Sequence, residues 1–298
     1  MIAAMSYYDA LDFGSMESGT IPVQECDGAS VSVRDLTRLL HIDCPDEDWL
    51  ARTALVLRRV HEGESLVRAG DKFHSLYVVR SGCFKTVYTD FSGSEQVLGF
   101  PMSGDLMGAD GIDSGHYSST AISLDTSEVV IVPLTSLARP AYECPKLESL
   151  LYRVLSRELV RVQNMAWAMG TLGADGRVAA FLLTLSARLG ALGYSRSSFN
   201  LRMTRQEIGS YLGLKLETVS RALSTLNVAG IIQVHQRSVD IVDADALRGV
   251  IYPASGVANI APRHGPAAAR RGAKGGKRTR KRQSQFQHGS AWRQLAAA

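Results

Sequence analysis

The sequence predicts a mixed α+β chain in which an antiparallel β-roll precedes one long helix, and two short helices with a strand hairpin follow. Three observations predict this order. Short apolar runs separated by glycines fill residues 55–137, an unbroken helical pattern runs from Lys146 to about Leu172, and two short helical patterns lie between Thr204 and Gly230. At 298 residues the chain is long enough for two domains.

The β-roll is predicted by the rhythm of strands and turns. Glycines at positions 63, 70, 82, 93 and 104 recur every 7 to 12 residues, which is the spacing of turns in an all-β sandwich or barrel. The apolar runs of this region are Leu76–Val79, Thr86–Tyr88, Val97–Phe100 and Val129–Val132. We expect the β-roll over residues 46–142, after a polar N-terminal extension over residues 1–45.

The long helix, expected over residues 143–172, carries a stripe that predicts a homodimer. Its apolar residues step by 4, 3, 4 and 3, the pattern of a two-stranded coiled-coil seam. The alternative is that this stripe packs on the β-roll of its own chain. Leu147, Leu151 and Val154 supply other apolar faces for that purpose. The seam residues are Leu155, Leu159, Val162, Ala166 and Met169.

The first short helix has a recognisable beginning and end. Thr204 followed by Glu207 forms a capping box, so a helix is expected to begin there. Ile208, Tyr211 and Leu212 fall on one helical face. Gly213 ends the helix, because glycine readily adopts the positive φ that follows a helix C-terminus.

The second short helix divides into a buried and an outward side. Leu216, Val219, Leu223 and Leu226 are expected on the buried stripe. That leaves Glu217, Thr218, Ser220 and Arg221 outward near the N-terminus, where a recognition helix meets base edges in a DNA major groove.

The outward residues suit base reading. Arg221 can donate twice to guanine, Glu217 can accept from cytosine N4, and Ser220 can pair with several bases. The alternative is an exposed ion pair between Glu217 and Arg221, which lie four residues apart. Two predicted strands, Ile231–His235 and Ser238–Val242, favour the first interpretation, because a hairpin directly after a recognition helix is the wing of a winged helix. With a helix expected over Asp175–Gly190, we place the winged-helix domain at residues 173–250.

The net charge of +4 conceals an asymmetry. Residues 251–298 hold ten of the 33 basic residues and none of the 29 acidic ones, which leaves 23 basic against 29 acidic residues before them. We expect this segment to be a disordered basic tail. It either holds phosphates without sequence preference or is dispensable.

Other classes of protein are disfavoured. The cysteines at positions 26, 44, 83 and 144 form no Cys-x-x-Cys pair, so neither a disulfide framework nor a zinc site is expected. An enzyme on a cupin-like β-roll would need clustered metal-binding histidines, whereas His61, His74 and His116 are widely spaced. We therefore expect no catalytic site.

The chain shows no sign of a membrane or secretory protein. Its apolar runs fall short of the roughly 18 residues that span a bilayer, and its first residues lack the basic region of a secretory signal. We expect a cytoplasmic protein with no membrane partner.

Three strings in this order resemble the CRP/FNR family of bacterial transcription regulators, and lean to its FNR branch. They are GESLVRAGDKFHSLYVVRSGCFK (63–85), GFPMSGDLMGADGI (99–112) and TRQEIGSYLGLKLETVSRAL (204–223). The resemblance implies a cyclic-nucleotide-binding-like jelly roll as sensor, a homodimer and double-stranded DNA as partner. It also implies that Glu217, Ser220 and Arg221 read a TTGAT-like inverted repeat. Lys215 stands where many relatives have a Thr or Ser N-cap, and could pair with a phosphate.

We add Thr204, Arg205 and Thr218 to the expected DNA-binding residues. The loop Asp110–His116 matches a surface that family members turn toward RNA polymerase, which makes that enzyme an expected partner.

The sensor departs from the family. A [4Fe–4S] cluster needs four cysteines, but the N-terminal stretch offers only Cys26 and the β-roll position falls on Val130. The cyclic AMP pocket needs a Glu and an Arg-Ser pair, whereas the matching positions are Ala109 and Ser119-Thr120.

We therefore expect no cofactor. The alternative is a β-roll that binds an unidentified ligand, or haem through His74 or His116. Val162 places an apolar residue on the seam, where cluster-bearing relatives use a charged residue to keep dimerisation weak. This favours a standing dimer that binds DNA in air without added ligand.

Overall fold

The computed structural model describes residues 30–32, 36, 39, 54–133 and 145–252. The chain divides into two compact units, one of residues 1–165 with 202–214 and one of residues 166–201 with 215–298. Most of the expected polar extension and almost all of the expected basic tail lie outside the described residues, as do Cys26, Cys44 and Cys144.

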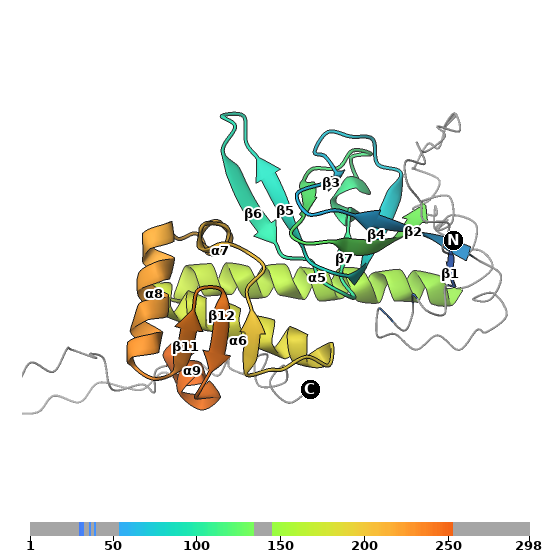
Figure 1. Cartoon of the computed structure of the whole chain (residues 1–298). Coiled ribbons are helices and arrows are strands. Elements are labelled where there is room, and N and C mark those ends of the chain that lie inside the picture. Colours follow the sequence, from blue (N-terminus) through green and yellow to red (C-terminus); the bar gives the residue numbers. More distant parts are fainter. Residues whose placement is uncertain (1–29, 33–35, 37–38, 40–53, 134–144, 253–298) are drawn as a thin grey trace, which may run out of the picture. The chain divides into compact units, whose positions relative to one another are not determined.

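The first unit contains a β-roll made of two antiparallel sheets (Figure 1). The five-stranded sheet has the order β1-β2-β9-β4-β7, and the four-stranded sheet has the order β3-β8-β5-β6. In chain order the strands are β1 (Ser30–Ser32), β2 (Ala54–Val60), β3 (Ser65–Val67), β4 (Ser75–Ser81), β5 (Phe84–Thr89), β6 (Glu95–Gly99), β7 (Leu106–Met107), β8 (Thr120–Ser123) and β9 (Ser127–Pro133). The four predicted apolar runs all form strands, and the predicted fold class is confirmed. β1, which pairs with β2, lies within the segment where the sequence shows little pattern.

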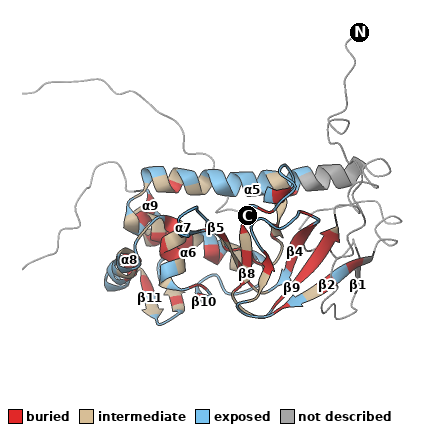
Figure 2. Ribbon diagram, turned by 90° about the horizontal axis from the view of Figure 1, so that it is seen from above, coloured by how far each residue is buried: buried red, intermediate tan, exposed pale blue. Residues whose placement is uncertain are grey.

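Strand β9 is the centre of the five-stranded sheet. Ile131 lies opposite Val56 of β2 on one side and opposite Tyr77 of β4 on the other. Val129 and Val130 are fully buried, and Figure 2 shows β4 and β9 largely in the colour of buried residues. The core combines side chains from both sheets with Val154 of the long helix, which was expected to face the roll.

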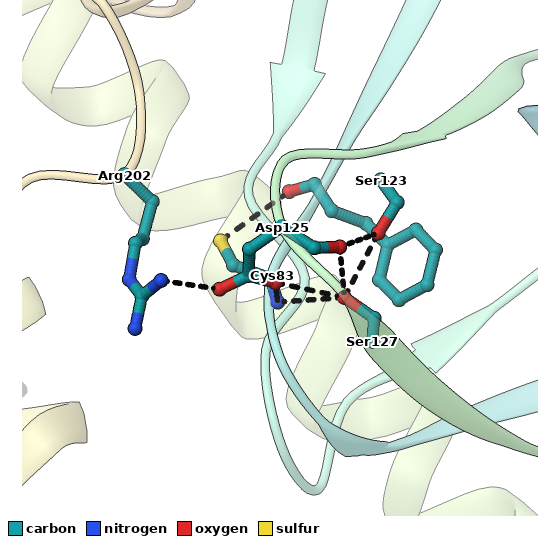
Figure 3. A network of polar contacts seen from close by, with 6 residues as sticks. Cys83, Ser123, Asp125, Ser127 and Arg202 are labelled. Atoms are coloured by element: carbon teal, nitrogen blue, oxygen red, sulfur yellow. Dashed lines mark hydrogen bonds and ion pairs between the residues drawn. The ribbon is translucent and has the colours of Figure 1, made fainter. Parts of the chain in front are cut away.

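The turn between β4 and β5 depends on Gly82 and a polar network around it (Figure 3). Gly82 has a φ of +90°, in the left-handed region that favours glycine. The Asp125 carboxylate accepts a hydrogen bond from the Cys83 N–H group at 2.9 Å and from the Ser127 hydroxyl at 2.9 Å. Ser123 donates to Ser127 at 2.8 Å. A Cβ at position 82 would overlap the Ser127 hydroxyl and lie 2.8 Å from Asp125 Oδ1, so the network leaves no room for a side chain.

The helices follow the predicted order. They are α5 (Pro145–Thr171), α6 (Ala174–Ala191), α7 (Arg205–Leu212), α8 (Leu216–Val228) and α9 (Ala244–Ile251). None of the helices among the described residues is long and apolar enough to cross a membrane.

The second unit contains α6, α8, α9 and a three-stranded sheet. Its strands are β10 (Ser198–Asn200), β11 (Ile232–His235) and β12 (Ser238–Ile241), in the order β10-β12-β11. Helix α6 packs against both α8 and α9. The predicted hairpin after α8 is confirmed, whereas β10 and α9 were not predicted. Helix α9 begins at Asp243, whose side chain accepts hydrogen bonds from the Asp245 and Ala246 N–H groups.

Replacing Gly82 with alanine tests the crowding at the β4–β5 turn. We expect Gly82→Ala to lower the free energy of unfolding by about 2–5 kcal/mol, since it adds a steric clash to the strain of a positive φ. Gly93→Ala is the matched control, because Gly93 has a φ of +82° but a methyl group at this position would meet nothing within 4 Å. It should cost only about 1–2 kcal/mol in urea unfolding. Equal losses in the two variants would contradict the role given to the network.

Candidate nucleic-acid interface

Helix α7 begins with the predicted capping box. The Thr204 hydroxyl accepts a hydrogen bond from the Glu207 N–H group at 3.2 Å, and Glu207 Oε2 accepts from the Thr204 N–H group at 2.7 Å. The helix ends at Gly213, which has a φ of 63° and a ψ of 38°. Ile208 and Leu212 are buried and Tyr211 is half-buried, as their shared face predicts. Both predicted boundaries of α7 are confirmed.

Helix α8 begins at Leu216 after a residue that does not cap it. Lys215 occupies the N-cap position with an extended backbone and makes no capping hydrogen bond. Its ammonium group is a donor only, so it cannot accept from the first N–H groups of the helix. Lys215 is exposed and carries its charge beside those N–H groups, the combination that suits a phosphate.

The buried side of α8 differs from the prediction at one position. Val219, Leu223 and Leu226 are buried in the second unit, where α8 packs against α6 and β11. The prediction for Leu216 was wrong, since this side chain is 43% exposed. Leu216 is the first residue of the helix, one turn ahead of Val219. Helical periodicity alone therefore predicts a buried stripe that is one turn too long.

The predicted base-reading residues lie together on α8, away from its buried stripe. Glu217 and Arg221 are exposed, and Thr218 and Ser220 are half-buried. Among the described residues, no ion pair joins Glu217 to Arg221, so their charged groups remain available to an external partner. Thr204 is exposed and Arg205 is half-buried at the start of α7.

The wing follows α8 directly. His235 of β11 lies opposite Ser238 of β12, across a two-residue turn in which Gln236 has a φ of 55°. Asn227, in the last turn of α8, accepts a hydrogen bond from the Val234 N–H group at 3.0 Å through its side chain. This bond holds the first strand of the wing against the end of the helix.

Contacts that the sequence did not predict hold α7 within the first unit. Lys85 of β5 donates to Glu207 Oε1 at 2.7 Å, and the two side chains are only 20% and 18% exposed. The Val97 N–H group donates to the Ser210 hydroxyl at 2.8 Å. The rings of Phe100 and Tyr211 meet edge to face with their centres 5.2 Å apart.

A second ion pair precedes α7. Arg202 lies 2.7 Å from Asp125 Oδ2, and the other oxygen of this carboxylate accepts from Cys83 (Figure 3). The same carboxylate therefore contacts the β4–β5 turn and the segment that leads into α7. Nothing in the local sequence pattern around Arg202 predicts this partner.

The Glu207 carboxyl is shared between the cap and the ion pair. Burial raises its pKa, but the hydrogen bonds from Lys85 and Thr204 lower it by more, so the pKa lies below the ordinary value of 4.5. The group is therefore ionised at neutral pH, as the ion pair with Lys85 requires.

The five predicted seam residues of α5 are exposed or half-buried in the single chain. Leu159 and Val162 are exposed, as is Ala166, while Leu155 and Met169 are half-buried. Figure 2 shows much of α5 in the colour of exposed residues. Val154 of the same helix is buried in the β-roll core and is not one of these residues.

The resemblance to the CRP/FNR family assigns a cyclic-nucleotide site to particular positions of the β-roll. Ala109 stands at the position assigned to the ribose-binding Glu, and Ser119-Thr120 at the positions assigned to the phosphate-binding Arg-Ser pair, and none of these side chains carries a guanidinium. His74 is half-buried with Nδ1 3.2 Å from the Ser75 hydroxyl, and burial lowers its pKa although Asp71 opposes the shift. His116 is exposed.

Comparisons with known proteins match both halves of the chain. Residues 57–139 match the cyclic nucleotide-binding domain and residues 176–250 match the Crp-like helix-turn-helix domain. The chain is 41% identical over 193 residues to the transcriptional regulatory protein btr of Bordetella pertussis, which covers 65% of this chain and 80% of that protein. It is 37% identical over 216 residues to the transcriptional activator protein FnrA of Stutzerimonas stutzeri, covering 72% and 88%.

Solved structures show the same similarity. FixK2 from Bradyrhizobium japonicum superposes with a TM-score of 0.60 at 27% identity, and the match covers 66% of this chain and 98% of that one.

The ion pair of Glu207 is expected to stabilise the fold in a pH-dependent way. Glu207→Gln keeps an acceptor for the cap but removes the charge, and should cost about 1–2 kcal/mol of unfolding free energy at pH 7. Because the pKa of Glu207 is lower in the folded than in the unfolded chain, this stabilisation is complete above pH 4.5 and disappears as the pH falls through the folded-state pKa. Urea unfolding at pH 7 and at about pH 3.5 would measure the difference.

Lys85→Met provides the partner for a double-mutant cycle, since it leaves the capping box intact. A cycle that shows no coupling between the two positions at pH 7 would refute the contribution of the pair.

Proposed function

Because the chain belongs to the CRP/FNR family of DNA-binding transcription regulators, we propose that it reads a TTGAT-like inverted repeat as a homodimer, without an iron–sulfur cluster or cyclic AMP. The observation that carries this proposal is the exposure of two charged side chains on α8 that do not pair with each other. Glu217 and Arg221 lie on either side of half-buried Ser220 in sequence, on the helix that precedes the wing.

The chemistry of this set matches a specific half-site. Family members with the E-x-x-S-R arrangement read TTGAT-like sequences, and the residues in those positions here are Glu217, Ser220 and Arg221. The Arg221 guanidinium would donate to guanine N7 and O6, and the Glu217 carboxylate would accept from cytosine N4. Lys215 and the residues at the start of α7, Thr204 and Arg205, would contact the phosphate backbone and set the register.

The dimer is supported by the exposed seam of α5. Regulators of this family typically act as dimers, and a two-fold dimer matches the symmetry of an inverted repeat. Leu159 and Val162 expose large apolar side chains that a second copy would cover. Association of this kind removes apolar surface from water, which is its main driving force.

The proposal of a cofactor-free regulator is supported by the residues at the family's ligand positions. Val130, at the β-roll position of a cluster cysteine, is fully buried in β9 among apolar neighbours. Ala109 and Ser119 replace the residues that bind a cyclic nucleotide. We infer that the protein dimerises and binds DNA in air, and that its abundance sets its activity. The loop of residues 110–116 would then contact RNA polymerase.

Base reading is tested by Arg221→Ala. We expect it to weaken binding to the correct half-site by about 1–3 kcal/mol and to relax the preference at one base pair, as measured by competition binding against single-base variants of the repeat. Lys215→Ala is the contrasting variant, because a lost phosphate contact weakens all sequences alike and lowers the salt slope by about one. Unchanged base preference in Arg221→Ala would refute the assignment.

The seam is tested by introducing a charge into it. Val162→Glu should convert the dimer into a monomer, because an apolar seam position cannot hold two carboxylates. Val160→Glu is the matched control, since Val160 is 45% exposed and Val162 60% exposed on the same helix, but Val160 lies off the seam. Sedimentation equilibrium in air would measure both. A wild-type protein that is monomeric in air would refute the standing dimer.

A further inference from the structure

One carboxylate oxygen in the β-roll gathers three hydrogen-bond donors. Asp110 lies on the short 3₁₀ turn η2 (Ala109–Gly111), and its Oδ2 atom accepts from the Ser118 N–H group at 3.1 Å. It also accepts from the Ser118 hydroxyl at 2.7 Å and from the Ser119 hydroxyl at 2.8 Å. One backbone N–H group and two hydroxyls converging on one oxygen form the kind of donor set that binds an oxyanion.

The resemblance to the CRP/FNR family assigns the phosphate-binding pair to residues that include one of these donors. Ser119-Thr120 occupies the place of the phosphate-binding pair, and the Ser119 hydroxyl already donates to Asp110. Thr120 is also engaged, since its hydroxyl accepts from the Ala69 N–H group at 3.1 Å. The Ser119 hydroxyl thus gives its proton to Asp110, while the Thr120 hydroxyl is held in place by the bond from Ala69.

Tyr117, which directly precedes the two serines in the sequence, is buried. This side chain is only 1% exposed, and its hydroxyl donates to the Ser75 carbonyl at 2.7 Å. Phe73 meets its ring edge to face with the centres 5.5 Å apart. A Cβ at Gly108 would lie 3.0 Å from the Tyr117 ring, so the backbone approaches the ring closely on that side as well.

The charge of Asp110 is not neutralised locally. Among the described residues no lysine or arginine pairs with this carboxylate, which differs from Glu64, Asp105 and Asp125, each of which binds an arginine. A phosphate ester brought to the same donors would meet an uncompensated negative charge at close range, and like charges at such a distance repel strongly.

We propose that the Asp110 carboxylate is an internal anion that occupies the phosphate seat of the β-roll. It keeps phosphate esters out of the wild-type protein. Once the carboxylate is removed, the same donors form a site for small oxyanions such as acetate or inorganic phosphate. The proposal concerns the β-roll alone and holds whichever DNA sequence α8 reads.

The test is anion rescue of the full-length Asp110→Ala variant. We expect a lower melting temperature than that of the wild type in sodium chloride, and a saturable recovery of a few degrees on adding sodium acetate or sodium phosphate at matched ionic strength. The matched control is Asp113→Ala, an exposed carboxylate of the same loop without a partner among the described residues. Any general salt effect appears equally in the wild type, in Asp113→Ala and in Asp110→Ala, so only the excess recovery counts.

Two outcomes would overturn the proposal. One is an Asp110→Ala variant that gains no more from acetate or phosphate than Asp113→Ala does, and the other is cyclic AMP binding to the wild type in calorimetry. If Asp110→Ala does not fold in chloride, it is refolded in acetate and in phosphate at the same ionic strength: folding in these anions supports the proposal, and failure to fold in any of the three salts overturns it. All of these measurements are made without DNA, so a wrong DNA site would leave them unchanged.

Discussion

Four carboxylates that each bind a backbone N–H group and a cation organise the first unit. Glu64, Asp105, Asp125 and Glu207 accept from a main-chain N–H group through one oxygen and pair through the other. Their cations are Arg58, Arg161, Arg202 and Lys85, respectively. Because a charged acceptor strengthens the bond to the backbone, and the cation in turn compensates the charge, each pair fixes a turn and a distant side chain together. Asp105 in this way connects the β-roll to α5, and Asp125 and Glu207 hold the segment around α7.

The sequence predicted those structural elements that are determined by residues close together in the chain. The capping box of Thr204, the glycine that ends α7 and the glycine-spaced strands all follow from residues a few positions apart, and all are confirmed. Strand β10 and helix α9 were missed because three residues of edge strand and eight of helix carry too short a pattern. Leu216 was misassigned because periodicity does not say where a helix meets its packing partners. The pairing of Lys85 with Glu207 spans 122 positions, and Glu207 already had a complete local explanation as a cap.

The β-roll and the winged helix differ in whether their polar groups are bonded within the chain or exposed. On α8 the charged side chains of Glu217 and Arg221 point away from the buried stripe and are exposed to an outside partner. At η2 the Ser118 N–H group and the Ser118 and Ser119 hydroxyls donate to Asp110 instead. The fold of the β-roll matches the cyclic nucleotide-binding domain, while we propose that its phosphate position is taken by Asp110. A shared fold shows how a domain is built, while the side chains at the site decide what it binds.

Because Glu207 both caps α7 and pairs with Lys85, the acidic and basic residues of this ion pair cannot be exchanged. In an ordinary surface ion pair the acidic and basic residues can trade places, because attraction depends only on opposite signs. Here the acid must remain on α7, since a lysine in its place has no lone pair to accept from the Thr204 N–H group. Exchanging the two residue types would restore the attraction and still leave the helix start without its cap. Related chains that keep this ion pair are therefore free to vary the cation on β5, but are held to Glu at the third position of the helix.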